Sequence, residues 1–452
     1  MQRSYNNIVV LGAGESGNGA AILAKHKGIP VFVSDYGTIK EHYKQELITE
    51  GIDFEEGGHT KERILAADLI IKSPGIPEKA PLIKELRAAG KEIISEIEFG
   101  YWYKGDSKII AITGSNGKST TTSLLYHLLK NAELDVSMVG NIGISFAKQV
   151  ALKPTAWYVM EISSFQLDDI RDFRPEIGIL LNITPDHLDR YDYKFENYIA
   201  SKFRIAKNQE ADDLLIANTD DPEIKAYLAQ HTIKPKLIPI TMSEQNLTQD
   251  EGAFMKDEEL HLKYKGEDMN LSIHDLALKG RHNQYNSMAA GISARAAGIR
   301  KEKIRESFAT FEGLEHRLEF VATIRGVDFI NDSKGTNLNS VWFALESMKQ
   351  PVVLILGGQD KGNDYNEIMD LVQEKVRAIV CMGVDNAPIH KAFENVIKNI
   401  VDTHSAVDAV KAAYALAEKG DVVLLSPGCA SFDLFKNYED RGTQFKQAVR
   451  EL

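Results

Sequence analysis

Residues 109–120 have the sequence Ile-Ile-Ala-Ile-Thr-Gly-Ser-Asn-Gly-Lys-Ser-Thr, and this stretch decides the fold of the middle of the chain. The β-branched run 109–113 predicts a buried strand, the glycines predict a turn, and the pattern from Thr121 to Lys130 predicts a helix. Such a turn aims backbone N–H groups and a helix N-terminus at one point, where a polyphosphate can bind. The predicted phosphate-binding residues are Gly114, Ser115, Asn116, Gly117, Lys118, Ser119 and Thr120.

Two side chains in this stretch carry the expected chemistry. Lys118 can reach the outer phosphates, and the Ser119 hydroxyl can ligate Mg²⁺. The spacing differs from the common phosphate loop, because Ile112 stands where that pattern has its first glycine. A chance glycine turn before a helix is the alternative, but strand, turn, Lys-Ser and helix all fall in register. We therefore expect the chain to hydrolyse or transfer a nucleotide phosphate.

Composition narrows the class of protein. The 452 residues are 43% hydrophobic and 26% charged, as in ordinary globular proteins, and suffice for about two to four domains. The net charge of −12 argues against a general nucleic-acid binder. With two cysteines, no signal-like N-terminus and no apolar run of membrane length, we expect a cytoplasmic protein without disulfides or membrane contact. Cys429 is expected to be a buried thiol rather than a nucleophile.

Strand-like runs alternate with helical patterns along almost the whole chain, which predicts parallel sheets covered by helices. There are too many strands for one sheet, so we predict an α/β protein of three domains. Residues 1–97 form a Rossmann-like domain, 98–313 a central phosphate-loop domain, and 314–452 a second Rossmann-like domain. Residues 234–275 interrupt the rhythm and predict a small antiparallel flap on the middle sheet. The predicted strands are 8–11, 31–34, 69–71, 109–113, 157–160, 177–183, 214–217, 327–330, 352–356, 378–382 and 422–425.

A second glycine loop, Gly12-Ala13-Gly14-Glu15-Ser16-Gly17, follows the first predicted strand, and Asp35 ends the next one. This matches the dinucleotide fingerprint, so an NAD-dependent oxidoreductase is one interpretation. A glycine turn that only packs helix on strand is another. Any diphosphate can bind such a turn, however, and the chain has two phosphate loops on separate predicted sheets. Two nucleotides, or a nucleotide and a nucleotide-linked substrate, therefore fit the sequence better than NAD alone. Residues 73–77 would form another wall of this crevice.

Polar residues at strand ends predict a metal site. Glu161 ends an apolar strand, and residues 182–191 follow another, so both reach the edge where α/β sheets bind ligands. Glu161 can bind Mg²⁺, and His187 beside Asp186 is a candidate second ligand. Lys202, on a helix predicted over 197–207, would by its pattern alone be solvated.

These motifs together resemble those of the Mur ligases, the ATP-dependent amide-forming enzymes of peptidoglycan synthesis. The resemblance covers essentially the whole chain. Its markers are GSNGKST (114–120), MEISSFQL (160–167), NITPDHLDRY (182–191), GRHNQYNSMAA (280–290), HR (316–317), NDSKGTN (331–337) and SPGCASFDLFKNYEDRG (426–442).

The resemblance implies roles for individual residues. Lys118 and Ser119 would hold ATP and Mg²⁺, Glu161 and His187 would ligate metal, and Lys202 would be carried as a carbamate that ligates metal. The implied adenine, ribose and phosphate contacts are Asn283, Asn286, Arg317 and Asp332. The implied UDP contacts are Ser16, Asp35, Ser73 and Gly75, with Asn141 near the diphosphate and reacting end. The resemblance does not explain the acidic Glu15 beside the diphosphate loop, for which a contact with uracil rather than phosphate is one interpretation. The implied amino-acid contacts are Lys334, Thr336, Lys361, Ser431 and Tyr438.

The resemblance also implies a reaction, in which a monomeric enzyme with two Mg²⁺ ions joins D-glutamate to UDP-N-acetylmuramoyl-L-alanine through an acyl-phosphate. Lys118, His187, Lys202 and Lys334 would be the catalytic residues. Three alternatives remain: another Mur or folylpolyglutamate-type ligase that adds a different amino acid, an NAD-dependent oxidoreductase, and a non-catalytic nucleotide-binding module. The base that deprotonates the incoming amine is not identified by the sequence, although His187 and Asp186 are candidates.

Overall fold

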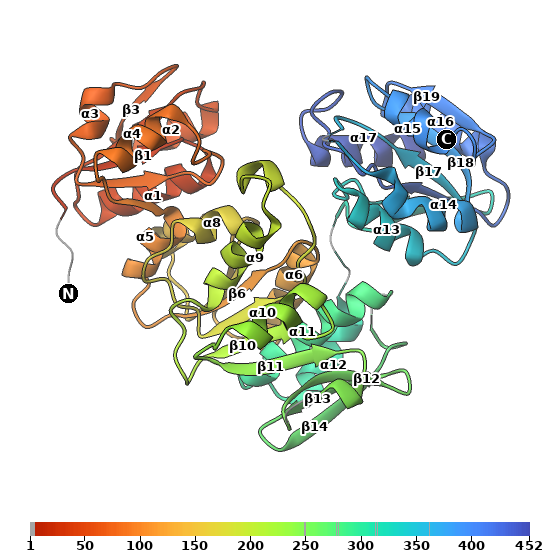
Figure 1. Ribbon diagram of the computed structural model, residues 1–452, viewed down its shortest axis with the longest axis horizontal. Coiled ribbons are helices and arrows are strands. Elements are labelled where there is room, and N and C mark those ends of the chain that lie inside the picture. Colours follow the sequence, from red (N-terminus) through yellow and green to blue (C-terminus); the bar gives the residue numbers. More distant parts are fainter. Residues whose placement is uncertain are drawn as a thin grey trace. The chain divides into compact units, whose positions relative to one another are not determined.

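The computed structural model describes residues 5–452 except 248, 249, 277, 279, 312, 314 and 361. Two compact units divide the chain, Met1–Ala277 with Gln284–Phe311, and Leu278–Asn283 with Glu312–Leu452. Three sheets lie within them, and each combines parallel strands with helices (Figure 1). The predicted α/β class with three sheets is therefore confirmed. Among the described residues, no helix combines the length and the apolar character that a bilayer crossing requires.

The N-terminal sheet has five parallel strands in the order β3-β2-β1-β4-β5. Helices α3 and α4 pack on one face through Ile64, Ile83 and Leu86, and the core of the other face includes buried residues of α1 and α5. The elements are β1 Ile8–Leu11, α1 Glu15–His26, β2 Val31–Asp35, α2 Glu41–Thr49, β3 Asp53–Glu56, α3 Lys61–Leu65, β4 Leu69–Lys72, α4 Pro81–Ala88, β5 Ile93–Ser95 and α5 Glu96–Tyr103.

The central sheet has nine strands in the order β14-β13-β12-β11-β10-β9-β6-β8-β7. Its first elements are β6 Lys108–Thr113, α6 Lys118–Asn131, β7 Val136–Gly140, α7 Phe146–Leu152, β8 Trp157–Glu161, α8 Ser164–Asp168, β9 Ile177–Leu180, η1 Leu188–Arg190, α9 Phe195–Phe203 and η2 Arg204–Ala206. Those that follow are β10 Leu214–Asn218, α10 Pro222–Gln230, β11 Lys236–Thr241, η3 Glu244–Asn246, β12 Gly252–Lys256, β13 Glu259–Tyr264, β14 Glu267–Ser272, α11 Arg281–Ala296 and α12 Lys301–Thr310.

The antiparallel flap is shorter than predicted. Strands β12, β13 and β14 pair antiparallel, but β11 pairs parallel with β10, and β12 pairs parallel with β11. Residues 236–241 therefore extend the parallel sheet. Their run Ile238–Thr241 is buried on both faces of the sheet, which is typical of parallel strands.

One hydrophobic core joins the first two sheets. It includes Ile8 and Val10 of β1, Phe99 of α5, Phe146 of α7 and Tyr158 of β8. The expected domain boundary at residue 97 falls inside α5. This helix packs on α1 of the N-terminal domain and on α7 of the central domain. This continuity explains why the N-terminal and central sheets belong to the same compact unit.

The C-terminal sheet has the order β15-β16-β20-β17-β18-β19, and it is parallel except for the β15–β16 pair. Helices α13, α14 and α15 cover one face, and α16 and α17 cover the other. The elements are β15 Glu319–Ile324, β16 Val327–Asn331, α13 Leu338–Glu346, β17 Val352–Leu356, η4 Tyr365–Ile368, α14 Met369–Lys375, β18 Val376–Met382, α15 Ala387–Phe393, β19 Ile400–Thr403, α16 Ala406–Leu416, β20 Val422–Leu425 and α17 Tyr438–Arg450.

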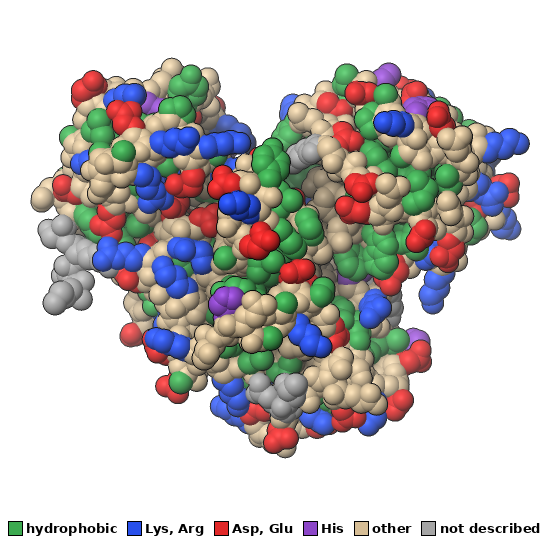
Figure 2. Space-filling view, viewed as in Figure 1, with side chains coloured by type: hydrophobic (Ala, Val, Ile, Leu, Met, Phe, Trp, Pro, Cys, Tyr) green, Lys and Arg blue, Asp and Glu red, His purple; other side chains and the backbone are tan. Residues whose placement is uncertain are grey.

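The surface charges are mixed. On the face shown in Figure 2, basic and acidic side chains are interspersed over each unit, with hydrophobic side chains between them. A net charge of −12 is therefore compatible with local cationic sites.

Candidate active site

The loop between β6 and α6 has the backbone geometry of a phosphate cradle. Gly117 precedes α6 with φ +83°, a left-handed conformation that side chains disfavour. A Cβ at this position would lie 2.4 Å from Asn286 Oδ1. The chain therefore turns tightly enough for α6 to begin at Lys118 and to direct its first backbone N–H groups to the carboxyl end of the sheet. The predicted strand, turn and helix are confirmed at this position.

Asn182 braces this loop from the neighbouring strand end. Its Oδ1 accepts a hydrogen bond from Asn116 N at 2.8 Å, and its Nδ2 donates to Asn116 O at 3.0 Å. The Ser115 hydroxyl also donates to Thr184 O at 3.0 Å. Sequence reasoning assigned Asn182 no role, although its place directly after a buried strand and opposite the phosphate loop was a usable signal.

Two lysines converge on the loop. The Lys118 and Lys202 ammonium groups each donate to Gly114 O at 2.8 Å, and Lys118 also donates to Ser115 O at 2.8 Å. Lys202 is 1% exposed and lies 4.6 Å from the ring centroid of Tyr198. Burial, and then the Lys118 cation, hold the pKa of Lys202 well below its usual range.

The expectation that Lys202 is solvated is therefore wrong, because its side of α9 faces the phosphate loop. The lowered pKa favours the neutral amine, which is the nucleophilic form of lysine. A buried amine with a lowered pKa beside a phosphate cradle is chemically different from the solvated cation that its sequence pattern predicts.

Glu161 ends β8 directly beside the phosphate loop, since it pairs in register with Ile112 of β6. Its Oε1 accepts a hydrogen bond from Asn141 Nδ2 at 2.7 Å. Its Oε2 is buried without a hydrogen-bond partner among the described residues. An orphaned, buried carboxylate oxygen is costly unless a cation or water binds it, so this donor fits Mg²⁺.

His187 follows β9 at the same edge of the sheet. Its φ of +53° is unusual for a residue with a side chain, and its Nε2 lies 3.6 Å from Asp186 Oδ2. The imidazole is 43% exposed and packs edge-on to Phe165. Ser119 and Thr120 are both buried in the first turn of α6. The predicted ligands Ser119, Glu161 and His187 therefore all follow or adjoin the ends of neighbouring strands.

The N-terminal glycine loop is braced by its own domain. Asp35 accepts hydrogen bonds from Ala13 N at 2.7 Å and from Gly37 N at 2.8 Å. The Ser73 hydroxyl donates to Gly12 O at 3.2 Å, which joins the loop to the 73–77 wall. Ser16 and Gly75 belong to these two segments, in the first turn of α1 and in the wall.

Glu15, for which the resemblance gives no role, contacts the central domain. Its Oε1 accepts a hydrogen bond from Ser145 N at 2.9 Å. A negative carboxylate favours the N-terminus of α7, so Glu15 joins α1 to the central domain.

The second unit holds most of the remaining predicted contacts, whereas Asn286 lies in the first. Asp332 is buried, accepts a hydrogen bond from Ser426 Oγ at 2.8 Å and lies 4.0 Å from Arg317 Nη1; burial raises the pKa of its carboxyl to about 6. The Lys334 ammonium lies 5.4 Å from the Tyr438 ring centroid. Ser431 is buried and Thr336 is half-buried.

Arg441, which sequence reasoning did not assign, is also buried, and donates to Ser333 Oγ at 3.0 Å and to Cys429 O at 3.2 Å. Cys429 is itself a buried thiol, and burial raises its pKa to about 11. Lys361 lies outside the described residues. Asn283 and Asn286 are buried on α11, where Asn286 Oδ1 accepts from Thr121 Oγ1 at 3.1 Å.

Comparison with known proteins covers all three domains. The chain matches the Mur ligase MurD-like N-terminal domain over residues 6–95, the Mur ligase middle domain over 112–294, and the Mur ligase glutamate ligase domain over 316–429. It is 56% identical to the UDP-N-acetylmuramoylalanine–D-glutamate ligase of Bacteroides thetaiotaomicron over 98% of this chain and 99% of the relative. It is 52% identical to the Porphyromonas gingivalis protein of the same name over 100% of both chains.

Solved structures show the same fold at low identity. The pseudomurein peptide ligase type C of Methanothermus fervidus aligns with a TM-score of 0.62 at 20% identity, over 99% of both chains. UDP-N-acetylmuramate–alanine ligase MurC of Thermotoga maritima aligns with a TM-score of 0.61 at 17% identity, over 99% of this chain and 100% of the other. Family models that together span most of the chain, and full-length relatives above 50% identity, lead to one conclusion: the chain belongs to the Mur ligase family.

Proposed function

We propose that this protein is an ATP-dependent ligase that adds D-glutamate to UDP-N-acetylmuramoyl-L-alanine, with release of ADP and phosphate, in cytoplasmic peptidoglycan-precursor synthesis. The match over the whole chain to relatives named for that reaction carries the proposal. The geometry agrees with it, because a phosphate cradle and two lysines adjoin the same sheet edge as a carboxylate oxygen that has no hydrogen-bond partner in the described part of the chain.

The reaction requires two displacements. The L-alanyl carboxylate attacks the γ-phosphorus of ATP, ADP leaves, and an acyl-phosphate forms. The amine of D-glutamate then attacks the acyl carbon, loses a proton, and inorganic phosphate leaves as the amide forms. Both reactants of the first step are anions, so catalysis consists of positioning them and cancelling their charge.

Lys118 can supply part of that cancellation. It now donates to the carbonyls of its own loop, and it can exchange these bonds for phosphate oxygens. One cation 4 Å from an anion is worth about 4 kcal/mol at an effective dielectric constant of about 20. If it is realised only in the transition state, this energy corresponds to roughly a thousandfold in rate.

Mur ligases depend on ATP and generally use Mg²⁺. Ser119, Glu161, His187 and a modified Lys202 would hold two ions, which would neutralise charge on the phosphates. In its neutral form the Lys202 amine can attack CO₂ and lose a proton, and the resulting carbamate carries a negative charge where the protonated lysine would carry a positive one. The low pKa of Lys202 supports this modification.

We assign the remaining groups by domain, with residues 1–97 binding UDP, 98–313 binding ATP and 314–452 binding the amino acid of a monomeric enzyme. Asn141, held beside Glu161, would contact the reacting end of the UDP-sugar. The proposed UDP contacts are Ser16, Asp35, Ser73 and Gly75. The proposed nucleotide contacts are Asn283, Asn286, Arg317 and Asp332, and the proposed D-glutamate contacts are Lys334, Thr336, Lys361, Ser431 and Tyr438.

A phosphate-release assay tests this proposal. Purified protein, ATP, Mg²⁺ and UDP-N-acetylmuramoyl-L-alanine are mixed with D-glutamate, L-glutamate, L-alanine or meso-diaminopimelate. We expect release with D-glutamate that also requires the UDP-sugar. Release with another member of the panel would move the protein to a different ligase class, and no release would refute the ligase assignment.

A further inference from the structure

Arg190, at the end of η1 in the central domain, holds a loop of the N-terminal domain. Its guanidinium donates to Pro74 O at 3.1 Å, Gly75 O at 3.4 Å and Ile76 O at 3.5 Å. The guanidinium also lies 4.3 Å from the ring centroid of Phe165, which restricts its position. We infer that Arg190 is a positioning residue for the UDP-sugar, acting through residues 73–77, the 73–77 loop. This inference rests on the proposed function.

The stereochemistry of the peptide bond shows what this contact does. In a planar trans peptide, the carbonyl of one residue and the N–H of the next point in opposite directions. Because the Pro74 carbonyl faces Arg190, the Gly75 N–H points away from the guanidinium. On that side Ile76 N donates to Ser73 O at 3.1 Å, and the Ser73 hydroxyl reaches Gly12 O. Arg190 thus orients a backbone donor that an anionic substrate can use.

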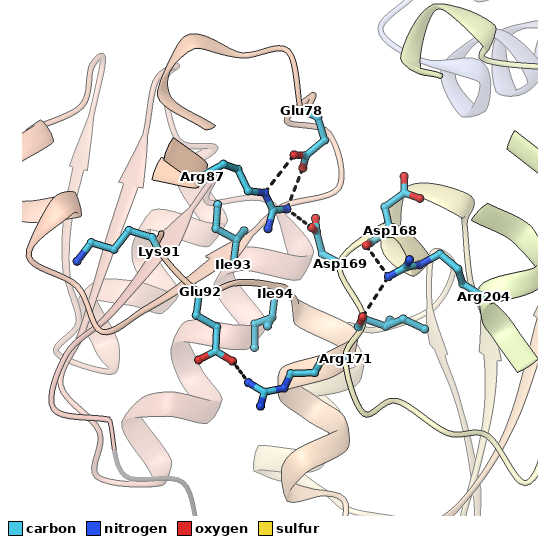
Figure 3. A pocket seen from close by; sticks show the side chains of 11 residues that line it. Glu78, Arg87, Lys91, Glu92, Ile93, Ile94, Asp168, Asp169, Arg171 and Arg204 are labelled. Carbon is cyan, nitrogen blue, oxygen red and sulfur yellow. Dashed lines mark hydrogen bonds and ion pairs between the residues drawn. The ribbon is translucent and has the colours of Figure 1, made fainter. Parts of the chain in front are cut away.

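The same loop is anchored at its base by an ion cluster in which Lys72 and Asp169 are buried. The Lys72 ammonium donates to Ile76 O at 3.2 Å, and it lies 2.9 Å from Glu78 Oε1 and 3.0 Å from Asp169 Oδ2. Figure 3 shows the Arg87 guanidinium joined to both Glu78 and Asp169. Since Asp169 belongs to the central domain, the loop is fixed to that domain at two places, through Asp169 and through Arg190.

Arg190 also connects the loop to the predicted metal ligand. Its backbone N donates to His187 O at 2.9 Å, so the two residues share one short turn. A cavity of about 410 Å³ lies beside this turn, lined by Glu78, Asp189 and Arg190 among others. One short segment therefore links the loop that would bind the diphosphate to the side chain that would bind metal at the reacting end.

Steady-state kinetics with three variants tests the inference. Arg190→Ala removes all three carbonyl contacts, and Arg190→Lys keeps the charge but not the planar fork. Arg171→Ala is the matched control, because Arg171 pairs with Glu92 across the same two domains but does not contact the loop. The KM values for UDP-N-acetylmuramoyl-L-alanine, ATP and D-glutamate are measured for each variant, together with thermal unfolding.

We expect Arg190→Ala to raise the KM for the UDP-sugar about tenfold or more, the typical consequence of losing hydrogen bonds from a charged donor. The KM of Arg190→Ala for ATP should stay within about twofold of the wild-type value. Arg190→Lys should still show most of the increase in the KM for the UDP-sugar, and Arg171→Ala should have wild-type KM values. A wild-type KM for the UDP-sugar in Arg190→Lys would show that only the positive charge matters. Equal increases of this KM in Arg190→Ala and Arg171→Ala would show a general weakening of the contact between the two domains. Either result would overturn the inference. An active wild type with an unchanged KM in Arg190→Ala would also overturn it, whereas an inactive wild type would refute the proposed function instead.

Discussion

Glu96, the first residue of α5, is a buried carboxylate whose ionisation should weaken the protein at neutral and alkaline pH. Its Oε1 accepts hydrogen bonds from Ser145 Oγ and Ala147 N, both at 2.6 Å, which joins α5 to the start of α7. Its Oε2 is buried without a hydrogen-bond partner among the described residues. Burial is the main cause that raises the pKa of Glu96 from 4.5 to about 7.

The sign and size of the effect follow from that shift. Below pH 4.5 the carboxyl is neutral in both the folded and the unfolded chain, so its ionisation costs nothing. Between pH 4.5 and 7 the unfolded chain loses its proton first, and stability falls as the pH rises. Above pH 7 the full difference of about 2.5 pH units costs about 3 kcal/mol of unfolding free energy.

Glu96→Gln keeps the accepting oxygen and removes the charge. We expect its unfolding free energy, measured with urea, to equal that of wild type near pH 4.5 and to exceed it by about 2–3 kcal/mol at pH 8. Glu98→Gln is the matched control. Glu98 Oε1 accepts hydrogen bonds from Trp102 Nε1 and Asp172 N, and its Oε2 accepts from the backbone N–H groups of residues 171 and 173. The amide NH₂ of Glu98→Gln would replace one of these acceptors with a donor, so this variant should be destabilised. A difference between Glu96→Gln and wild type that does not change with pH would refute the reasoning.

Three further perturbations test the site. Lys202→Ala should lose nearly all phosphate release and regain part of it with a short added carboxylic acid, which would replace the carbamate; no recovery over a series of acids, with intact folding by circular dichroism, would contradict the modification. Gly117→Ala forces a Cβ against Asn286 at φ +83° and should weaken binding of an ATP analogue by roughly a hundredfold or more in calorimetry, so wild-type affinity would refute the cradle. Glu161→Gln keeps an oxygen for Asn141 but loses the anionic ligand, so kcat should fall by roughly a hundredfold and recover partly at high Mg²⁺; an unchanged Mg²⁺ dependence would remove Glu161 from the metal site.

The sequence predicted strands well where both faces are buried. Strands β1, β17 and β20 begin and end where their apolar runs do, because burial requires a continuous apolar sequence. Edge strand β3, with the sequence Asp-Phe-Glu-Glu, was missed because it is partly exposed and its acidic composition is atypical of strands. Strand β9 ends earlier than predicted, at Leu180.

The side chains that brace the site were the hardest to predict. Lys202 and Arg441 are charged residues, a type that is usually exposed to solvent. Only the packing of α9 and α17 shows that they are buried. The role proposed for Arg190 depends on hydrogen bonds to three backbone carbonyls. Every residue has such a carbonyl, so the residue types at positions 74–76 do not reveal these contacts. Residues whose function depends on long-range contacts of this kind cannot be recognised from local sequence patterns.

Oxygen-isotope transfer tests the central claim most directly. UDP-N-acetylmuramoyl-L-alanine labelled with ¹⁸O in its alanyl carboxylate is converted with ATP and D-glutamate, and the released phosphate is analysed by mass spectrometry. If the carboxylate attacks ATP at the phosphate loop to form an acyl-phosphate, one ¹⁸O atom should appear in each phosphate released. Released phosphate without ¹⁸O, with three oxygens from ATP and one from water, would show that the loop hydrolyses ATP without activating the carboxylate, and would contradict the account.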